Sequence, residues 1–208
     1  FKHYFIKRPL KLLDVGCGYG PFLDFIKYKL PNVKRCGVDL NEDILIRYLK
    51  KQGHSYYQGK FENVNFKGKF DIVTMLEFLD PNTVLKKVNL LLNNKGMLVI
   101  EVPNFKYHLM KGKIEKSRLY QKIFKYPEYG LMPHVHFNYF TSKSLTKMLN
   151  NQGFKVIKIF TREITFNADN EYSKILIYLS RIYNNIALVL SRMNIYVGSA
   201  FILIAIKK

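Results

Sequence analysis

The sequence predicts an α/β domain in which a mostly parallel sheet is covered by helices on both faces. Three observations carry this prediction. Short apolar stretches alternate with amphipathic stretches through the first half of the chain, a glycine-rich turn follows the first apolar stretch, and no apolar segment reaches the length of a membrane-spanning helix. Regular alternation of strand and helix is typical of parallel sheets that are buried on both faces.

The first half of the chain contains five expected strands, at residues 10–15, 36–40, 54–58, 70–75 and 97–102. Helices are expected between them. The first begins at Pro21, a residue suited to the first helical turn. The second is capped by Asn41 and places Ile44, Leu45, Tyr48 and Leu49 on one face. The third begins at Asp80 and ends at Gly96.

The second half is less regular. Residues 105–137 show no sustained period and are expected to form a long excursion over the active-site edge. A short helix is then expected from residue 141 or 142 to 149, a strand over 154–160, a long helix over 172–193 and a last strand over 200–206. No internal repeat is visible, so we expect a single domain over residues 1–208 with a lid-like insertion at about 105–140.

Composition excludes several classes of protein. The chain has 208 residues, of which 48% are hydrophobic and 24% charged, so a packed globular fold is expected. Its two cysteines cannot form a disulfide framework, which favours the reducing cytoplasm, and the absence of a spanning apolar stretch favours a soluble protein. The net charge of +19 would attract nucleic acid, an anionic membrane surface or an acidic substrate, but a lysine-rich composition alone also explains it. Nucleic acid is not favoured, because no basic motif of a nucleic-acid module is present, and peripheral membrane contact stays open.

A nucleotide-binding turn is predicted at residues 14–20, Asp-Val-Gly-Cys-Gly-Tyr-Gly, between an expected strand and an expected helix. Glycine allows the backbone to turn sharply and to pass close to a ligand. Asp39 lies 23 residues after Gly16, at the end of the next strand, where a carboxylate can accept hydrogen bonds from ribose hydroxyls. A helix-capping role for Asp39 is disfavoured, because Asn41 fills that role.

The spacing of the glycines argues against a nicotinamide dinucleotide, whose GxGxxG pattern would place a glycine at Pro21. The pattern here is GxGxG preceded by Asp14, which resembles motif I of the class I S-adenosylmethionine-dependent methyltransferases. The resemblance implies a Rossmann-like fold, with a seven-stranded, mostly parallel sheet, helices on both faces and an antiparallel last strand. It also implies S-adenosyl-L-methionine as the cofactor.

The resemblance assigns roles residue by residue. Asp14 would lie near the methionine moiety, the loop of Gly16, Cys17, Gly18, Tyr19 and Gly20 would pass beneath the cofactor, and Asp39 would hold the ribose. Glu62, after Phe61, would lie near the adenine. The full set of expected cofactor-binding residues is Asp14, Gly16, Cys17, Gly18, Tyr19, Gly20, Asp39, Leu40, Phe61, Glu62, Met75 and Leu76.

Segments 101–104, 133–137 and 151–154 resemble the small-molecule branch that includes ubiquinone-biosynthesis and sugar methyltransferases, so an oxygen of a small-molecule acceptor is expected to receive the methyl group. A hydroxyl acceptor needs a base, and His136, or alternatively His134, is the candidate. A loop histidine that bonds only to backbone has equal weight. His3, His54 and His108 are expected at the surface, and no metal-binding pattern is visible.

Two other functions stay open. An RNA methyltransferase is motivated by the charge, although the chain lacks the Asn/Asp-Pro-Pro-aromatic signature of many enzymes that methylate amino groups. A non-catalytic S-adenosylmethionine-binding protein is motivated by the stretch before Asp80, which is shorter than in many relatives.

Overall fold

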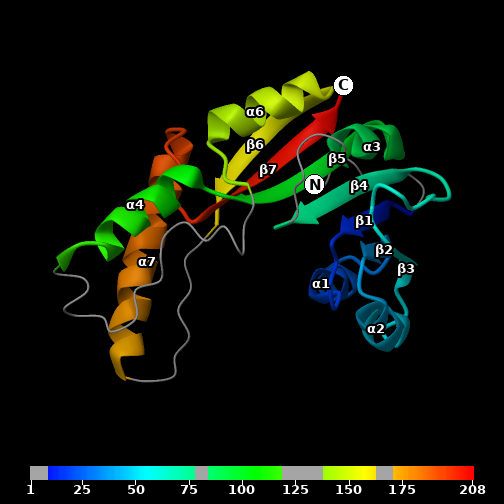
Figure 1. Cartoon of the computed structure of the whole chain (residues 1–208), viewed down its shortest axis with the longest axis horizontal. Coiled ribbons are helices and arrows are strands. Elements are labelled where there is room, and N and C mark those ends of the chain that lie inside the picture. Colours follow the sequence, from blue (N-terminus) through cyan, green and yellow to red (C-terminus); the bar gives the residue numbers. More distant parts are fainter. Residues whose placement is uncertain (1–8, 78–83, 119–137, 163–170) are drawn as a thin grey trace. The chain divides into compact units, whose positions relative to one another are not determined.

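The computed structural model describes residues 9–77, 84–118, 138–162 and 171–208 of the chain. Two compact units are formed, unit 1 by Phe1–Glu101, Lys147–Lys158 and Leu203–Lys208, and unit 2 by Val102–Thr146 and Ile159–Ile202. The strands are β1 (Lys11–Val15), β2 (Lys34–Asp39), β3 (Ser55–Gln58), β4 (Phe70–Leu76), β5 (Leu92–Pro103), β6 (Phe154–Thr161) and β7 (Ala200–Lys207). The helices are α1 (Pro21–Lys29), α2 (Glu42–Ile44) with its π-helical continuation η2 (Leu45–Lys50), α3 (Val84–Leu91), α4 (Phe105–Glu115), α6 (Ser142–Asn151) and α7 (Glu171–Arg192) (Figure 1).

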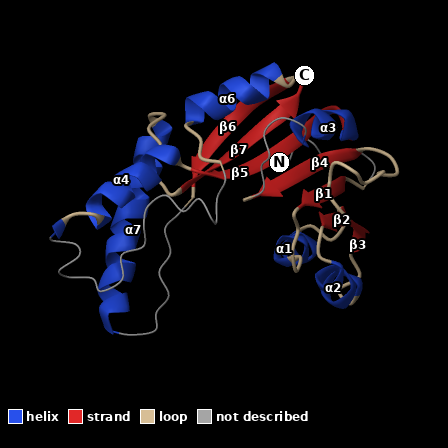
Figure 2. Ribbon diagram, viewed as in Figure 1, coloured by secondary structure: helices blue, strands red, loops and turns tan. Residues whose placement is uncertain are grey.

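The seven strands form one sheet in the order β3-β2-β1-β4-β5-β7-β6 (Figure 2). β1 pairs in parallel with both β2 and β4, and β4 pairs in parallel with β5. β7 is antiparallel to β6, because Arg162 bonds to Ala200 at one end of the pair and Lys208 bonds to Gly153 at the other. The predicted fold class is therefore confirmed. The strand order reverses between β1 and β4, and this reversal creates a switch point where ligands bind in α/β sheets.

The core of unit 1 is built around β1, the central strand. Leu12, Leu13 and Val15 are almost fully buried, as expected for a parallel strand covered on both faces. The apolar face of α1 packs on this strand through Leu23 and Ile26. This packing fixes the strand–turn–helix unit that carries the glycine-rich turn.

Asp71 links three strands at the end of the sheet that lies away from the glycine-rich turn. Its carboxylate accepts hydrogen bonds from the Lys11 backbone N–H at 2.9 Å and from the Asn93 side-chain amide at 2.7 Å. These contacts join the beginnings of β1, β4 and β5, far from the carboxyl ends of the strands. Asp71 therefore has a structural role.

Two boundaries differ from the prediction. The third helix ends at Leu91 rather than at Gly96, and β5 begins at once with Leu92. The Lys207 ammonium, from β7, donates to the carbonyls of Asn89 at 2.6 Å and Leu92 at 3.0 Å. The carbonyls at the end of α3 are therefore bonded to a lysine that is distant in sequence, and Gly96 does not end the helix.

Helix α4 is a second difference from the prediction. It is formed by the first eleven residues after Asn104, where the sequence predicts irregular chain.

Burial also corrects two predictions about side chains. Tyr48 does not share the buried face of Leu49, because the π-helical turn changes the angular spacing of the side chains. It is half exposed and packs edge-on against Tyr19. His54 is buried rather than at the surface, and its Nε2 lies 2.7 Å from the Asp24 carboxylate. His108 is half-buried, with Nε2 3.1 Å from the Ser199 carbonyl oxygen.

Unit 2 is organised by Asn104, which is fully buried. The side-chain oxygen of Asn104 accepts from the Lys106 backbone N–H and so caps α4. The side-chain NH₂ group donates to the carbonyls of Tyr196 at 3.1 Å and Gly198 at 2.8 Å. One side chain thus starts a helix and holds the turn before β7. In the described ranges, no helix is long and apolar enough to span a membrane.

Candidate functional site

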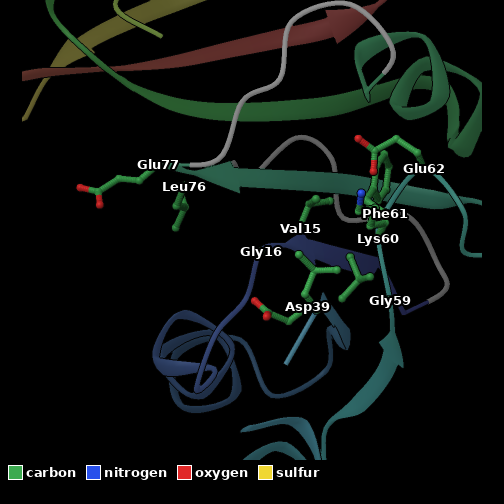
Figure 3. Close-up of a pocket in the computed structure, with 11 residues that line it drawn as sticks. Val15, Gly16, Asp39, Gly59, Lys60, Phe61, Glu62, Leu76 and Glu77 are labelled. Atoms are coloured by element: carbon green, nitrogen blue, oxygen red, sulfur yellow. The ribbon is translucent and has the colours of Figure 1, made fainter. Parts of the chain in front are cut away.

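A cavity of about 520 Å³ lies in unit 1 at the carboxyl ends of the parallel strands. It is lined by Val15, Gly16, Val38, Asp39, Leu40, Gly59, Lys60, Phe61, Glu62, Leu76 and Glu77. These residues follow or end β1, β2, β3 and β4, so the cavity occupies the switch point of the sheet (Figure 3). Its volume is typical of pockets for small molecules and cofactors.

The glycine-rich turn forms the floor between β1 and α1. Gly16, Gly18 and Gly20 have φ values of 72°, 49° and 81°, in the left-handed region that favours glycine. Gly20 also lacks room for a side chain, because an added Cβ would lie 2.3 Å from Cδ2 of the buried Leu49. The three glycines are therefore required by the shape of the turn, as the sequence predicted.

Asp39 ends β2 beside this turn. One oxygen of its carboxylate accepts from the Gly18 backbone N–H at 2.9 Å, and the other accepts from the Asn41 backbone N–H at 3.1 Å. The N–H of Asn41 lies before α2, which begins at Glu42, so neither bond caps that helix. These bonds hold the carboxylate at the cavity, and an ionised carboxylate has about four acceptor positions in all, so it can still accept from a ligand.

Asp14, the acid before the glycines, is buried behind the cavity wall. The Thr74 hydroxyl donates to its carboxylate at 2.6 Å. Burial raises the pKa of Asp14 to about 7, and the neighbouring Asp39 charge adds to this increase, while the Thr74 bond opposes it. A cation bound nearby would favour the ionised form of Asp14.

The loop after β3 forms a further wall, in which Phe61 is buried. The Lys87 ammonium, from α3, donates to the carbonyls of Glu62 at 2.8 Å and Val64 at 2.7 Å. It also lies 5.3 Å from the ring centres of both Phe61 and Phe66, within the range of cation–π attraction. Burial lowers the pKa of Lys87. Helix α3 thus holds the loop that lines the cavity.

The structure brings together half of the residues predicted to bind the cofactor. Six of them line the cavity: Gly16, Asp39, Leu40, Phe61, Glu62 and Leu76. Cys17 and Met75 do not line it. Cys17 is buried with its sulfur packed toward Gly37, and burial raises the pKa of its thiol to about 12. Met75 is fully buried in the core. Gly18 and Gly20 shape the turn, and Tyr19 is exposed.

Five lining residues are absent from our predicted set: Val15, Val38, Gly59, Lys60 and Glu77. Val15, Val38, Lys60 and Glu77 are each next to a predicted residue, and Gly59 directly follows β3, so the strand boundaries alone could have found them. Glu77 has φ 58°, unusual for a residue with a side chain, and its backbone N–H donates to the Glu101 carbonyl. In Figure 3 the Leu76 side chain points from β4 toward Gly16, whereas that of Glu77 points away.

His134 and His136, the candidate bases, lie outside the described residues, as does the Asp80 that we expect to start the third helix. Within the described ranges, no group of three or more potential metal ligands is present.

The chemistry of the lining fits a cationic nucleoside. Asp39 supplies acceptors for hydroxyl groups, and Val38, Phe61 and Leu76 supply apolar surface for a flat ring. Asp39 lies close enough to Asp14 for its charge to raise the pKa of the Asp14 carboxyl. Negative charge at the turn opposes a phosphate and favours a cation such as a sulfonium or an ammonium.

Several solved structures share this fold. The chain superposes on a SAM-dependent methyltransferase from Archaeoglobus fulgidus with a TM-score of 0.60 and 22% identity, over 99% of this chain and 89% of that one. Against the plantazolicin methyltransferase BpumL, solved with a triazolic substrate analogue and S-adenosylhomocysteine, the TM-score is 0.61 and the identity 20%, over 100% and 80% of the two chains. A SAM-dependent methyltransferase from Methanosarcina mazei gives 0.59 and 18%, over 99% and 96%.

At these identities the likeness shows the fold. A comparison with curated proteins gives no significant match. Residues 2–159, three quarters of the chain, match the family described as the methyltransferase domain. With the strand order and the glycine-rich turn, this match shows that the chain belongs to the class I S-adenosylmethionine-dependent methyltransferase domain family.

Proposed function

We propose that this chain transfers the methyl group of S-adenosylmethionine to an oxygen of a small-molecule acceptor, with the cofactor held in the cavity at the switch point. The observation that carries the cofactor site is the Asp39 carboxylate, held at the cavity by the Gly18 and Asn41 backbone. A carboxylate that is already oriented by two N–H groups accepts from ribose hydroxyls without further ordering.

The other walls are assigned by chemistry. The buried ring of Phe61 and the side chains of Leu40 and Leu76 offer apolar contact to an adenine, and Glu62 follows Phe61 on the same wall. Asp14, buried next to the lining residue Val15, is assigned to the end where the positive charges of the methionine part would lie, and it would ionise when they arrive. Gly16 allows close passage of the backbone beneath the cofactor.

The bound cofactor supplies an activated methyl group, so the work of the protein is positioning and exclusion of water. An acceptor hydroxyl also needs a group that takes its proton. We propose His136 for this base, with His134 as the alternative, since imidazole is a suitable acceptor near neutral pH. We further propose that residues 1–208 act as one methyltransferase domain and that residues 105–140 cover the acceptor.

A small acceptor is supported by two observations. BpumL, which shares the fold, is a plantazolicin methyltransferase whose structure contains a triazolic desmethylPZN analogue. The motifs of this chain also resemble those of small-molecule enzymes.

The deciding experiment is calorimetric titration with S-adenosylmethionine and S-adenosylhomocysteine. We expect both to bind, and Asp39→Ala to weaken each by at least about tenfold, the effect of losing one hydrogen bond to a charged group. Asp43→Ala, at an exposed acid on the next helix, is the control and should change nothing. Absence of binding, or equal effects of the two substitutions, would refute the cofactor site.

The acceptor class needs its own measurement. Turnover of a panel of hydroxylated metabolites, read as release of S-adenosylhomocysteine, would support it, and His136→Ala should then lower the rate with little change in cofactor affinity. Binding without turnover on every acceptor would favour a non-catalytic protein. Salt-dependent binding of RNA with methyl incorporation would favour an RNA methyltransferase.

A further inference from the structure

Helix α7, in unit 2, exposes an apolar stripe from Tyr178 to its end. Tyr178, Ile182, Ile186 and Val189 follow one another at intervals of four, four and three residues, which places them on one face. Between 42% and 65% of each side chain is exposed, and Met193 continues the stripe just beyond the end of the helix. We call these five residues the α7 stripe.

The opposite face of the helix is already occupied. Ser180 and Ala187 are buried, and the Tyr183 hydroxyl donates to the Val197 carbonyl. The helix therefore packs on its own unit through one side and shows the stripe on the other. A helix that is apolar on its outer face calls for a partner, because exposed apolar area is unfavourable in water.

Basic side chains border the stripe. Arg181 lies three residues after Tyr178, and Arg192 lies three residues after Val189, so both flank the same face and both are exposed. Within α7 the sequence has three basic residues and a single acidic one, Glu171. An apolar stripe with arginines at its edge is the pattern of helices that lie in the interface of an anionic bilayer.

Charge decides between the bilayer and a second copy of the chain. At a net charge of +19, two copies repel each other, and pairing the stripes would bring four arginines to one interface. An anionic surface attracts the same charges.

We infer that the α7 stripe docks this protein on anionic lipid bilayers, with Ile182, Ile186 and Val189 in the upper acyl region and Arg181 and Arg192 at the phosphates. The inferred contact is peripheral, through one face of a single helix. The inference is independent of the proposed acceptor, because it concerns where the protein binds and not what it methylates.

The absence of tryptophan from the chain allows a direct test. Ile186→Trp places a single fluorophore in the stripe, and Leu90→Trp places one at a somewhat more exposed apolar position on α3. We expect the Ile186→Trp emission to shift to shorter wavelength with vesicles of phosphatidylcholine and phosphatidylglycerol, and not with phosphatidylcholine alone. Leu90→Trp should show no shift with either.

Sedimentation with the mixed vesicles measures affinity. Ile182→Gln with Ile186→Gln should lower partitioning by at least about tenfold, since two buried apolar side chains are lost, whereas Leu90→Gln should not. Arg181→Gln with Arg192→Gln should lower it by about tenfold, and Arg47→Gln, on η2, much less. Circular dichroism and melting confirm that the variants are folded.

Three results would overturn the inference. The first is failure of the wild-type protein to bind the mixed vesicles. The second is a blue-shifted Ile186→Trp emission that depends on protein concentration without lipid, which identifies a second copy as the occupant. The third is a blue shift without lipid at every concentration, which identifies another segment of the same chain.

Discussion

The ammonium of Lys87 lies 2.7 Å from the carbonyl oxygen of Val64, 23 residues earlier in the chain, and 2.8 Å from that of Glu62. These two bonds join α3 to the loop that lines the cavity. Because Phe61 lies in the same loop and under the same ammonium, its ring is held in place by a residue that does not itself line the cavity. Lys87 is thus a positioning residue in our proposal.

Lys87→Met is therefore expected to weaken S-adenosylmethionine binding by roughly tenfold, since it removes charge-assisted bonds to two carbonyls. The KM for the cofactor should rise, while kcat at saturation should change little. Lys86→Met, at the exposed neighbour, is the control. Lys87→Arg should restore part of the affinity, because it keeps the donors and the charge. A fall in kcat at unchanged KM would contradict the positioning role.

The part of the site that follows from local sequence could be predicted. The turn at Gly16, Gly18 and Gly20 and the carboxylate of Asp39 each sit at the end of a strand whose apolar pattern is plain. The chain reaches these positions by short-range geometry, so spacing alone identified them.

What could not be predicted depends on contacts across long separations. Three contacts of this kind join residues that are distant in sequence. They are the bonds of Lys87 to the loop after β3, the bonds of Lys207 to the end of α3, and the contact of the buried His54 with Asp24. A lysine is usually exposed and a histidine often is, and nothing in the local sequence marks these three as different. Their roles appear only when the strands and helices are packed together.

Cofactor binding is expected to depend on pH through Asp14, whose pKa burial raises to about 7. Below this value native Asp14 keeps its proton, although an unfolded aspartate would ionise near 3.8. The free protein therefore loses stability as pH rises from about 4 to 7. A cationic ligand favours the ionised form, so its affinity should rise over the same range, by up to about tenfold per pH unit below 7.

Calorimetry in buffers of different ionisation enthalpy would count the proton released on binding. Asp14→Asn should abolish the release and flatten the affinity profile. Thr74→Val removes the bond that lowers the Asp14 pKa, so the midpoint of the profile should move to higher pH. An unchanged profile in Asp14→Asn would show that another group titrates.

Gly18 and Gly20 should respond differently to alanine. Both have a left-handed backbone, which costs an alanine roughly 1–2 kcal/mol. A Cβ at Gly18 meets no atom within 4 Å, so the backbone strain should account for the whole loss of unfolding free energy in Gly18→Ala. At Gly20 the Cβ would also strike the fully buried Leu49.

We therefore expect Gly20→Ala to lower the free energy of unfolding by more than Gly18→Ala. Combining Gly20→Ala with Leu49→Ala removes the clash, so the two effects should be less than additive in a double-mutant cycle. Chemical denaturation of the four proteins without cofactor measures this. Full additivity would mean that the Leu49 contact is relieved by small movements of the turn.

Asn104 is expected to be among the most sensitive positions of unit 2. Asn104→Ala removes the cap of α4 and leaves the carbonyls of Tyr196 and Gly198 without their amide donor. The cap contributes about 1 kcal/mol and each buried carbonyl bond a similar amount, which gives an expected loss of roughly 2–4 kcal/mol. Thr141→Ala removes only an exposed capping hydroxyl, before α6, and so measures the contribution of a helix cap by itself. The free energy of unfolding should fall by about 1 kcal/mol in that control. Equal losses in the two variants would mean that the Asn104 amide bonds contribute nothing beyond the cap.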